Sequence, residues 1–331
     1  MIQAEISPLE IPPTETPRPA VSVIIPAYNV SKYIGEALNS VFDQTFTSHE
    51  SIVINDGSAD TEELERVLEP YAARIRYIKQ ENLGAAAARN AGLRCAQGEF
   101  VAFLDADDTW SPDFLEQQID FLKSRNADVV YADALLFGDS SLAGRTFMEL
   151  QPSRGEVTSE SLLAVEVTVL TSAVLARKDA VFAVGLFDEE IKRGHDFDLW
   201  LRLAKNGARF AYQAKVLAQH RIVESGLSGN MMSQLERTLS VLETIKTRGK
   251  LTPGEDVAFR INLNRTLAEL ALENGKEKLL NRDFDGALQH FKEAKNLRHG
   301  WKLVLVCFGL RVAPRMVRRI YSRRNGASKG G

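Results

Sequence analysis

Cysteine is scarce in this sequence of 331 residues, which contains only Cys95 and Cys307, far apart along the chain. Because they do not have the spacing of a metal or redox pair, a disulfide framework and a cysteine-rich metal site are excluded, and a reducing compartment is favoured. The first residues lack the basic and apolar segments of a secretory signal, and no run reaches the ~20 apolar residues that cross a bilayer. We therefore expect a cytoplasmic protein, with peripheral attachment to the inner face of the membrane left open.

Acidic residues are absent from the C-terminal tail. Residues 298–331 contain nine Lys or Arg and no acid, whereas the rest of the chain contains 32 basic and 44 acidic residues. Eight uncharged residues, 303–310, precede a proline and a run of arginines. This pattern suits a helix lying on an anionic membrane surface, and docking of the same helix onto the protein is the alternative. Nucleic acid is not an expected partner, because no aromatic or groove-reading module accompanies the basic residues.

The hydrophobic pattern divides the chain into four parts. Residues 1–19 hold five of the eleven prolines and are expected to form a disordered leader. Over 20–230, short β-branched runs alternate with longer amphipathic segments, which predicts an α/β domain with a mostly parallel sheet and helices on both faces. Residues 231–300 have helical spacing and predict a helical extension, either a cover on the preceding domain or a tetratricopeptide-like pair. Residues 301–331 form the basic tail.

Individual elements of the α/β domain can be placed from the same pattern. Asp60 is expected to cap one helix, and Ser111 another, with Pro112 at its first position. The other expected helices are 32–44, 84–96 and 196–207. The expected strands are 21–26, 50–56, 74–80, 99–105, 127–137, 167–177 and 215–222.

Polar and glycine-containing motifs follow the first four expected strands. Ligands of open α/β sheets bind beyond the carboxyl ends of the strands, so we expect these motifs to meet at one edge of the sheet. Any one of them alone is weak, because NDGS is ordinary turn chemistry and GAAAAR suits any helix. The candidate binding residues at this edge are Pro26, Ala27, Tyr28, Asn29, Asp56, Gly57, Ser58, Asn82, Gly84 and Arg89.

The motif AFLDADDTW, residues 102–110, puts three carboxylates directly after a buried strand. Carboxylates this close raise each other's pKa unless a cation lies between them. In an extended segment Asp105 and Asp107 would point the same way, and oxygen ligands suit Mg²⁺ or Mn²⁺. A divalent metal bound there would neutralise charge on a departing diphosphate. The alternative is a loop of solvated acids in which Asp108 or Ser111 caps the turn.

The order of these motifs resembles the family 2 glycosyltransferases, which have the GT-A nucleotide-sugar fold, over roughly residues 21–228. The segment FDEEIKRGHDFDLWLRL, residues 187–203, fits the same pattern. The resemblance implies metal-dependent, inverting transfer of a sugar from a nucleotide-diphosphate donor to an acceptor hydroxyl. It implies a glycan or lipid-linked acceptor and a place in cell-envelope polysaccharide assembly. It further implies that Asp107 binds the metal directly, that Asp105 contacts metal or ribose, and that Asp56 accepts a nucleobase N–H.

The resemblance also implies a catalytic base. Asp196 is the expected base, with Asp198 as second choice, and His195 replaces the more usual glutamate. An imidazolium at His195 would hold the Asp196 carboxylate ionised and make it a weaker base. Alternatively, Asp196 is only an acid favoured by the helix dipole. Trp200 and Arg202 are expected to pack and pair within the helix.

The segment HRIVESGLS, residues 220–228, departs from the family pattern, because Val223 stands where many relatives have a histidine. Arg221 is kept as an expected diphosphate contact, with Ser225 as a further group that could meet phosphate. His220 is expected to be a packed strand histidine. Because of His195 and Val223, a non-catalytic nucleotide-sugar-binding scaffold remains the alternative to an enzyme.

Overall fold

The computed structural model describes residues 18–222, 231–298 and 300–327. The predicted leader lies almost wholly outside the described residues, as do Val223 and Ser225. The chain divides into two compact units, Met1–Gly226 and Leu227–Gly331.

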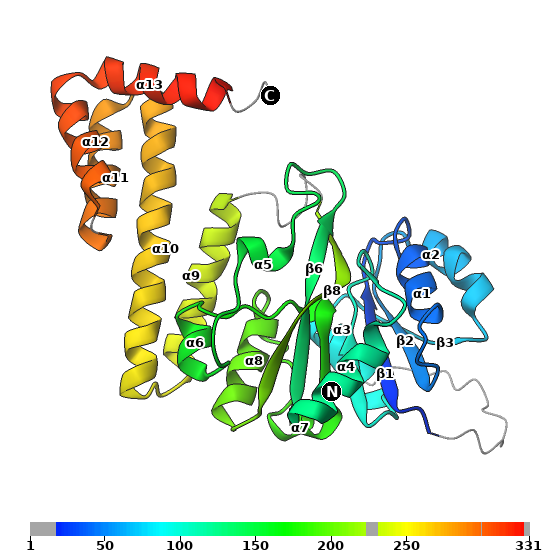
Figure 1. The fold of residues 1–331 in the computed structure, drawn as a ribbon. Coiled ribbons are helices and arrows are strands. Elements are labelled where there is room, and N and C mark those ends of the chain that lie inside the picture. Colours follow the sequence, from blue (N-terminus) through cyan, green and yellow to red (C-terminus); the bar gives the residue numbers. More distant parts are fainter. Residues whose placement is uncertain (1–17, 223–230, 299, 328–331) are drawn as a thin grey trace. The chain divides into compact units, whose positions relative to one another are not determined.

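The first unit contains an eight-stranded sheet with the order β3-β2-β1-β4-β7-β6-β8-β5 in the described residues (Figure 1). The pairs β1–β2, β2–β3, β1–β4 and β6–β8 are parallel, which confirms the predicted parallel arrangement. Strand β7 runs antiparallel to both β4 and β6, and β5 is antiparallel to β8. The strands are β1 Val21–Ala27, β2 His49–Asp56, β3 Ile75–Gln80, β4 Phe100–Phe103, β5 Thr109–Trp110, β6 Val129–Phe137, β7 Val174–Arg177 and β8 Phe210–Arg221.

Helices cover both faces of this sheet, as predicted. Successive side chains of β1 point to opposite faces of the sheet, and those on both faces are apolar. Val23 and Ile25 pack against one layer of helices, whereas Ile24 packs against the other. The first layer includes α1 Ile34–Phe42, α2 Thr61–Leu68 and α4 Phe114–Arg125. The second includes α3 Ala85–Cys95, α6 Ser159–Leu163, α7 Lys178–Ala183 and α8 His195–Lys205. A further short helix is α5 Phe147–Leu150.

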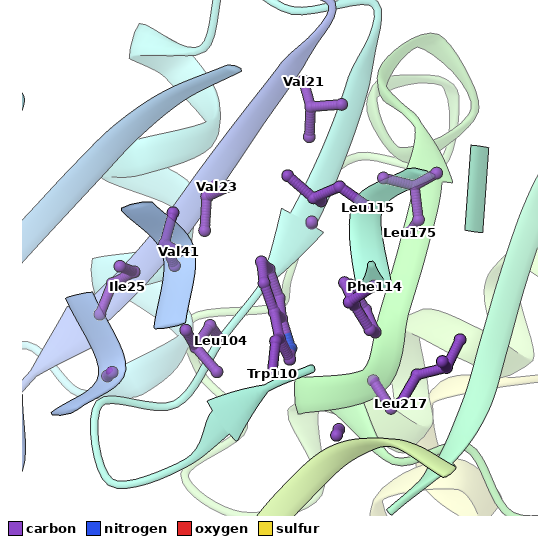
Figure 2. Close-up of a cluster of buried hydrophobic side chains, with 14 of the residues drawn as sticks. Val21, Val23, Ile25, Val41, Leu104, Trp110, Phe114, Leu115, Leu175 and Leu217 are labelled. Carbon is purple, nitrogen blue, oxygen red and sulfur yellow. The ribbon is translucent and has the colours of Figure 1, made fainter. Parts of the chain in front are cut away.

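The region after the DADD motif differs from the prediction. Residues 109–110 form the short strand β5, and the N–H of Ser111 donates to the carbonyl of Leu217 at 2.9 Å. The helix therefore begins later, at Phe114, with Asp113 at the N-cap position instead of Ser111. Trp110 stacks on Phe114 with ring centroids 4.2 Å apart, and this pair belongs to the core in Figure 2.

The second unit is helical, as expected for the extension. Its helices are α9 Met231–Arg248, α10 Pro253–Leu280, α11 Phe284–Leu297, α12 Trp301–Val312 and α13 Pro314–Ala327. Gly275 lets α10 approach α11 closely, since a Cβ there would lie 3.1 Å from Cε1 of Phe291. Within the described ranges, none of the helices has the length and apolar character required to pass through a membrane.

Candidate active site

The turns after β1 and β2 are joined by hydrogen bonds. The N–H of Asn29 donates to the Ser58 hydroxyl at 3.1 Å, and Oδ1 of Asn29 accepts from the N–H of Ala59 at 2.8 Å. Asn29 has a positive φ of 55°, a conformation that asparagine tolerates better than most residues. The Tyr28 side chain is exposed. Pro26 and Ala27, which were also predicted to bind the ligand, are the last two residues of β1.

Asp56 ends β2 and organises the loop after β3. Its Oδ1 accepts from Nε2 of Gln80 at 2.8 Å and from the N–H of Leu83 at 2.9 Å. Its Oδ2 accepts from the N–H of Gly84 at 2.9 Å, at the start of α3. A carboxylate has about four acceptor sites, so the three protein bonds leave room for the one nucleobase N–H that was predicted.

Gly57 and Gly84 are required by the backbone of these turns. Gly57 has a φ of 65°, and a Cβ there would lie 2.5 Å from the backbone nitrogen of Asn82. Gly84 has a φ of 96° and open space around it. The loop bearing Asn82 therefore lies directly against the turn after β2, which places these predicted residues beside one another.

The Arg89 side chain forms hydrogen bonds both to a residue just after β4 and to the first residue of α8. Its Nη2 donates to Oδ1 of Asp105 at 2.5 Å, and its Nη1 donates to Nε2 of His195 at 2.8 Å. Burial opposes ionisation of Asp105, but the Arg89 guanidinium holds the pKa of that carboxyl below its usual range. The buried Nε of Arg89 has no partner among the described residues.

The surroundings of His195 disfavour the imidazolium form, whose effect on Asp196 was left open from the sequence. Burial, and then the positive charge of Arg89, lower the pKa of His195 below its usual range. Because arginine can only donate, Nε2 of His195 accepts the bond and the ring is neutral. Its Nδ1 is buried without a partner in the described part of the chain. His195 is therefore a neutral link to Arg89.

The DADD segment is a turn and not the predicted extended strand end, because the N–H of Asp108 donates to the carbonyl of Asp105 at 3.0 Å. The fully buried Asp108 accepts from the N–H of Arg221 at 2.8 Å and pairs with Nδ1 of His220 at 3.0 Å. Although burial opposes it, the Asp108 charge raises the pKa of His220 to about 9. His220 is thus charged and ion-paired, in addition to its edge contact with Phe147.

Asp107 lies among other negative charges, as the sequence predicted for a carboxylate that binds a cation. Burial, followed by the charges of Asp108 and Asp105, raises the pKa of Asp107 to about 6. This excess of negative charge is what a divalent cation would relieve. In the described residues no group of three or more His, Cys, Asp or Glu forms a metal cluster. One or two carboxylates are nevertheless enough for Mg²⁺ or Mn²⁺ when substrate phosphates supply other ligands.

Arg221 lies beside the same turn but is already engaged. Its Nε donates to the carbonyl of Asp107 at 3.0 Å, and its Nη2 pairs with Glu36 at 2.7 Å. The guanidinium also stacks over Tyr33 and Phe137. A diphosphate contact by Arg221 stays a prediction, and it would compete with the exposed carboxylate of Glu36.

Asp196 lies in the first turn of α8, which begins after Gly194 in the left-handed region. Its Oδ2 accepts from the Thr171 hydroxyl at 3.3 Å, and its Oδ1 accepts from the N–H of the next residue at 2.9 Å. Asp198, the second-choice base, pairs with Arg202 at 2.7 Å. The predicted pairing of Arg202 and the burial of Trp200 are therefore confirmed.

Four residues of this region were not predicted from the sequence. Thr171 contacts Asp196, and the Ser172 hydroxyl accepts from the N–H of Asp105 at 3.2 Å. Glu36 pairs with Arg221, and Asp108 pairs with His220. From the sequence, Asp108 was expected only as a residue that could cap the turn. Thr171 and Ser172 lie in an ordinary apolar context, so no local signal marks them.

The sequence matches the Glycosyl transferase family 2 over residues 22–168. The putative teichuronic acid biosynthesis glycosyltransferase TuaG of Bacillus subtilis is 31% identical over 232 residues, which cover 69% of this chain and 89% of TuaG. The chain is a family 2 glycosyltransferase. A second relative of this glycosyltransferase is UDP-Glc:alpha-D-GlcNAc-diphosphoundecaprenol beta-1,3-glucosyltransferase WfgD of Escherichia coli. WfgD is 29% identical over 224 residues, covering 67% of this chain and 85% of WfgD.

Solved structures show the fold of this glycosyltransferase. S. aureus TarS 1–349 in complex with UDP superposes with a TM-score of 0.59 at 21% identity, covering 92% of this chain and 91% of TarS 1–349. The mannosyltransferase PcManGT of Pyrobaculum calidifontis, in complex with GDP-Man and Mn²⁺, has a TM-score of 0.60 at 20% identity. That match covers 96% of this chain and 86% of PcManGT. The predicted GT-A fold is thereby confirmed.

Proposed function

We propose that this glycosyltransferase moves a sugar from a nucleotide-diphosphate donor to the hydroxyl of a glycan or lipid-linked acceptor, with inversion at the anomeric carbon. The observation that supports this most is the position of Arg89. Its guanidinium binds Asp105, on the expected donor side, and His195, next to the expected base. The Arg89 side chain therefore connects Asp105 to the residue that directly precedes the proposed base.

The donor side would consist of the turns after β1, β2 and β4. Asp56 would accept an N–H of the nucleobase with its remaining lone pair, and exposed Tyr28 offers a flat surface nearby on the joined turns. Asp107 and the second oxygen of Asp105 would hold Mn²⁺ or Mg²⁺. When bound, that cation would offset the negative charge that develops on the leaving nucleoside diphosphate.

On the acceptor side, Asp196 would act as the base. Its carboxylate would take the proton of the acceptor hydroxyl as the acceptor oxygen bonds to the anomeric carbon and the bond from that carbon to the diphosphate breaks. The Thr171 hydroxyl would hold Oδ2 of Asp196 in orientation. Neutral His195 adds no positive charge beside this carboxylate, so it does not weaken the base in the way that an imidazolium would.

The names of the relatives support an assembly role in cell-envelope polysaccharide. TuaG is named for teichuronic acid biosynthesis, and WfgD for transfer from UDP-Glc to a diphosphoundecaprenol-linked sugar. TarS binds UDP, and PcManGT binds GDP-Man with Mn²⁺. These names favour a nucleotide-sugar donor and a divalent metal. We keep the cytoplasm as the proposed location, since the two free cysteines suit a reducing compartment.

The test is a donor screen followed by a release assay. Thermal shift with a panel of UDP and GDP sugars, with and without Mn²⁺, identifies the donor, because a ligand of the folded state stabilises it. Release of the nucleoside diphosphate from that donor is then measured with glycan and lipid-linked acceptors. We expect release to need the metal and to be lost in Asp107→Ala and Asp196→Asn.

A matched control is Asp120→Asn, which changes an exposed aspartate on α4 and should release diphosphate like the wild type. Metal-independent release would contradict the role of Asp107. Donor binding without release on any acceptor would instead favour the non-catalytic scaffold.

A further inference from the structure

Helix α12 has two apolar faces, and the protein covers one of them. Leu303, Val306, Cys307 and Leu310 follow helical spacing and pack into the core of the second unit. This core also contains Leu279 of α10 and Phe291 of α11. The inner face of α12 therefore accounts for the docking of the tail onto the protein, which was one of the two predicted alternatives.

The opposite face is equally apolar but faces solvent. Trp301 is 70% exposed and Phe308 is 65% exposed, where an ordinary surface helix would carry polar residues. Helix α13 adds two further exposed apolar side chains, Met316 and Ile320. We call this set the outer apolar face: Trp301, Val304, Leu305, Phe308, Val312, Met316 and Ile320.

Helices α12 and α13 also carry exposed positive charges. The exposed basic side chains of the same two helices are Lys302, Arg311, Arg315 and Arg319. No acid occurs anywhere between residues 298 and 331, so the segment does not neutralise its own charge. The combination of large apolar side chains and unbalanced basic residues is typical of helices that lie in a membrane interface.

We propose that α12 and α13 bind the surface of an anionic lipid bilayer. The outer apolar face enters the boundary between headgroups and acyl chains, and the basic side chains contact lipid phosphates. A second copy of the chain fits this face less well, because pairing two such faces would bring the basic residues of both copies together. Lipid headgroups of negative charge neutralise them instead. Binding to vesicles needs neither donor nor acceptor, so this surface is tested independently of sugar transfer.

Vesicle flotation of the full chain tests the apolar part. The vesicles contain phosphatidylethanolamine with phosphatidylglycerol, and phosphatidylcholine vesicles serve as the neutral comparison. We expect the double variant Trp301→Ser, Phe308→Ser to bind the anionic vesicles at least about tenfold more weakly than wild type. The matched control is Val257→Ser, Ile261→Ser, which removes two similarly exposed apolar side chains from α10, 59% and 55% exposed. This control should float like the wild type.

The charges are tested by Arg315→Gln and Arg319→Gln, singly and together. We expect binding to anionic vesicles to fall about fivefold for each charge removed, and to weaken as salt increases. Wild-type protein should bind phosphatidylcholine vesicles more weakly than the single and double arginine variants bind anionic vesicles.

Tryptophan fluorescence reports the depth of binding without a label. Of the three tryptophans, Trp110 and Trp200 are buried, whereas Trp301 is exposed. A blue shift of the emission on adding anionic vesicles would therefore come from Trp301, and Phe308→Ser should reduce it.

Three results would overturn the proposal. One is equal flotation of wild type and the Trp301, Phe308 double variant. Another is binding that ignores lipid charge and salt. The third is a dimer in solution that the double variant converts to monomer while the wild type does not float, which would assign the outer apolar face to a second copy.

Discussion

Asp56 and Asp196 are both expected to contact a substrate, but the structure holds them differently. Asp56 is buried at the end of β2 and accepts three bonds, two of them from backbone N–H groups. Among the described residues, Asp196 accepts one long bond from Thr171 and one from its own neighbour in α8. The carboxylate of the proposed donor side is thus held in place by the protein itself, whereas the proposed base keeps hydrogen-bonding capacity for an acceptor. Pre-organisation lowers the cost of binding, and spare capacity permits proton transfer.

The largest expected effect comes from the loosely held carboxylate. Asp196→Asn keeps the shape and the bond from Thr171 but removes the base, so kcat for transfer should fall about 10³-fold. Donor affinity and melting temperature should stay near those of wild type, because few protein contacts depend on the charge. The measurement is steady-state transfer together with donor titration. A melting temperature that falls with activity would contradict the comparison.

Asp56→Ala should have the opposite profile. It leaves Gln80 and the backbone N–H groups of Leu83 and Gly84 without their buried carboxylate acceptor, so the free energy of unfolding should drop by about 2–3 kcal/mol. Donor affinity should fall with it, since the loop before α3 loses its support. Urea unfolding and donor titration measure both. If donor affinity falls while the free energy of unfolding is unchanged, Asp56 acts on the ligand alone and the loop does not depend on it.

The ion pair of Asp108 with His220 should make stability depend on pH. The pKa of His220 rises from 6.5 to about 9 on folding, so the pair contributes fully below pH 6.5 and is lost as pH rises through about 9. We expect a loss of up to about 3 kcal/mol over that range, measured by urea unfolding without metal. His220→Asn should flatten this dependence, whereas His290→Asn, on α11, should keep it. A wild-type profile that is already flat would mean that the pair is not formed.

The smallest effect on kcat is expected for Thr171, whose hydroxyl donates to the proposed base Asp196. Thr171→Val keeps the volume but removes the hydroxyl that orients Asp196, so kcat should fall about three- to tenfold. Thr171→Ser retains the hydroxyl and should remain close to wild type. A loss in Thr171→Ser as large as in Thr171→Val would show that packing, and not the hydrogen bond, is what matters there.

The first half of the α/β unit was predictable because its signals are local. Each apolar run from Val21 to Phe103 is followed by its own turn motif, and the strands lie within about two residues of the predicted positions. The alternation of strands and helices predicted a mostly parallel α/β sheet, and the resemblance of the motifs to family 2 glycosyltransferases implied the GT-A fold. Prediction failed where distant segments decide the local structure. Pairing of β5 with β8 moves the start of α4 past Ser111, and Asp108 turns toward His220 in place of solvent.

The reversed direction of β7 has a consequence for how such sites are found. Val174, its first residue, lies opposite Phe103, the last residue of β4. A strand that runs parallel to β1 brings the residues after its carboxyl end to the edge of the sheet where the site lies. A strand that runs the other way, such as β7, brings the residues before its amino end to that edge. Thr171 and Ser172 reach Asp196 and Asp105 in this way. A search for functional groups in sheets of this kind must therefore look upstream of every reversed strand as well as downstream of the others.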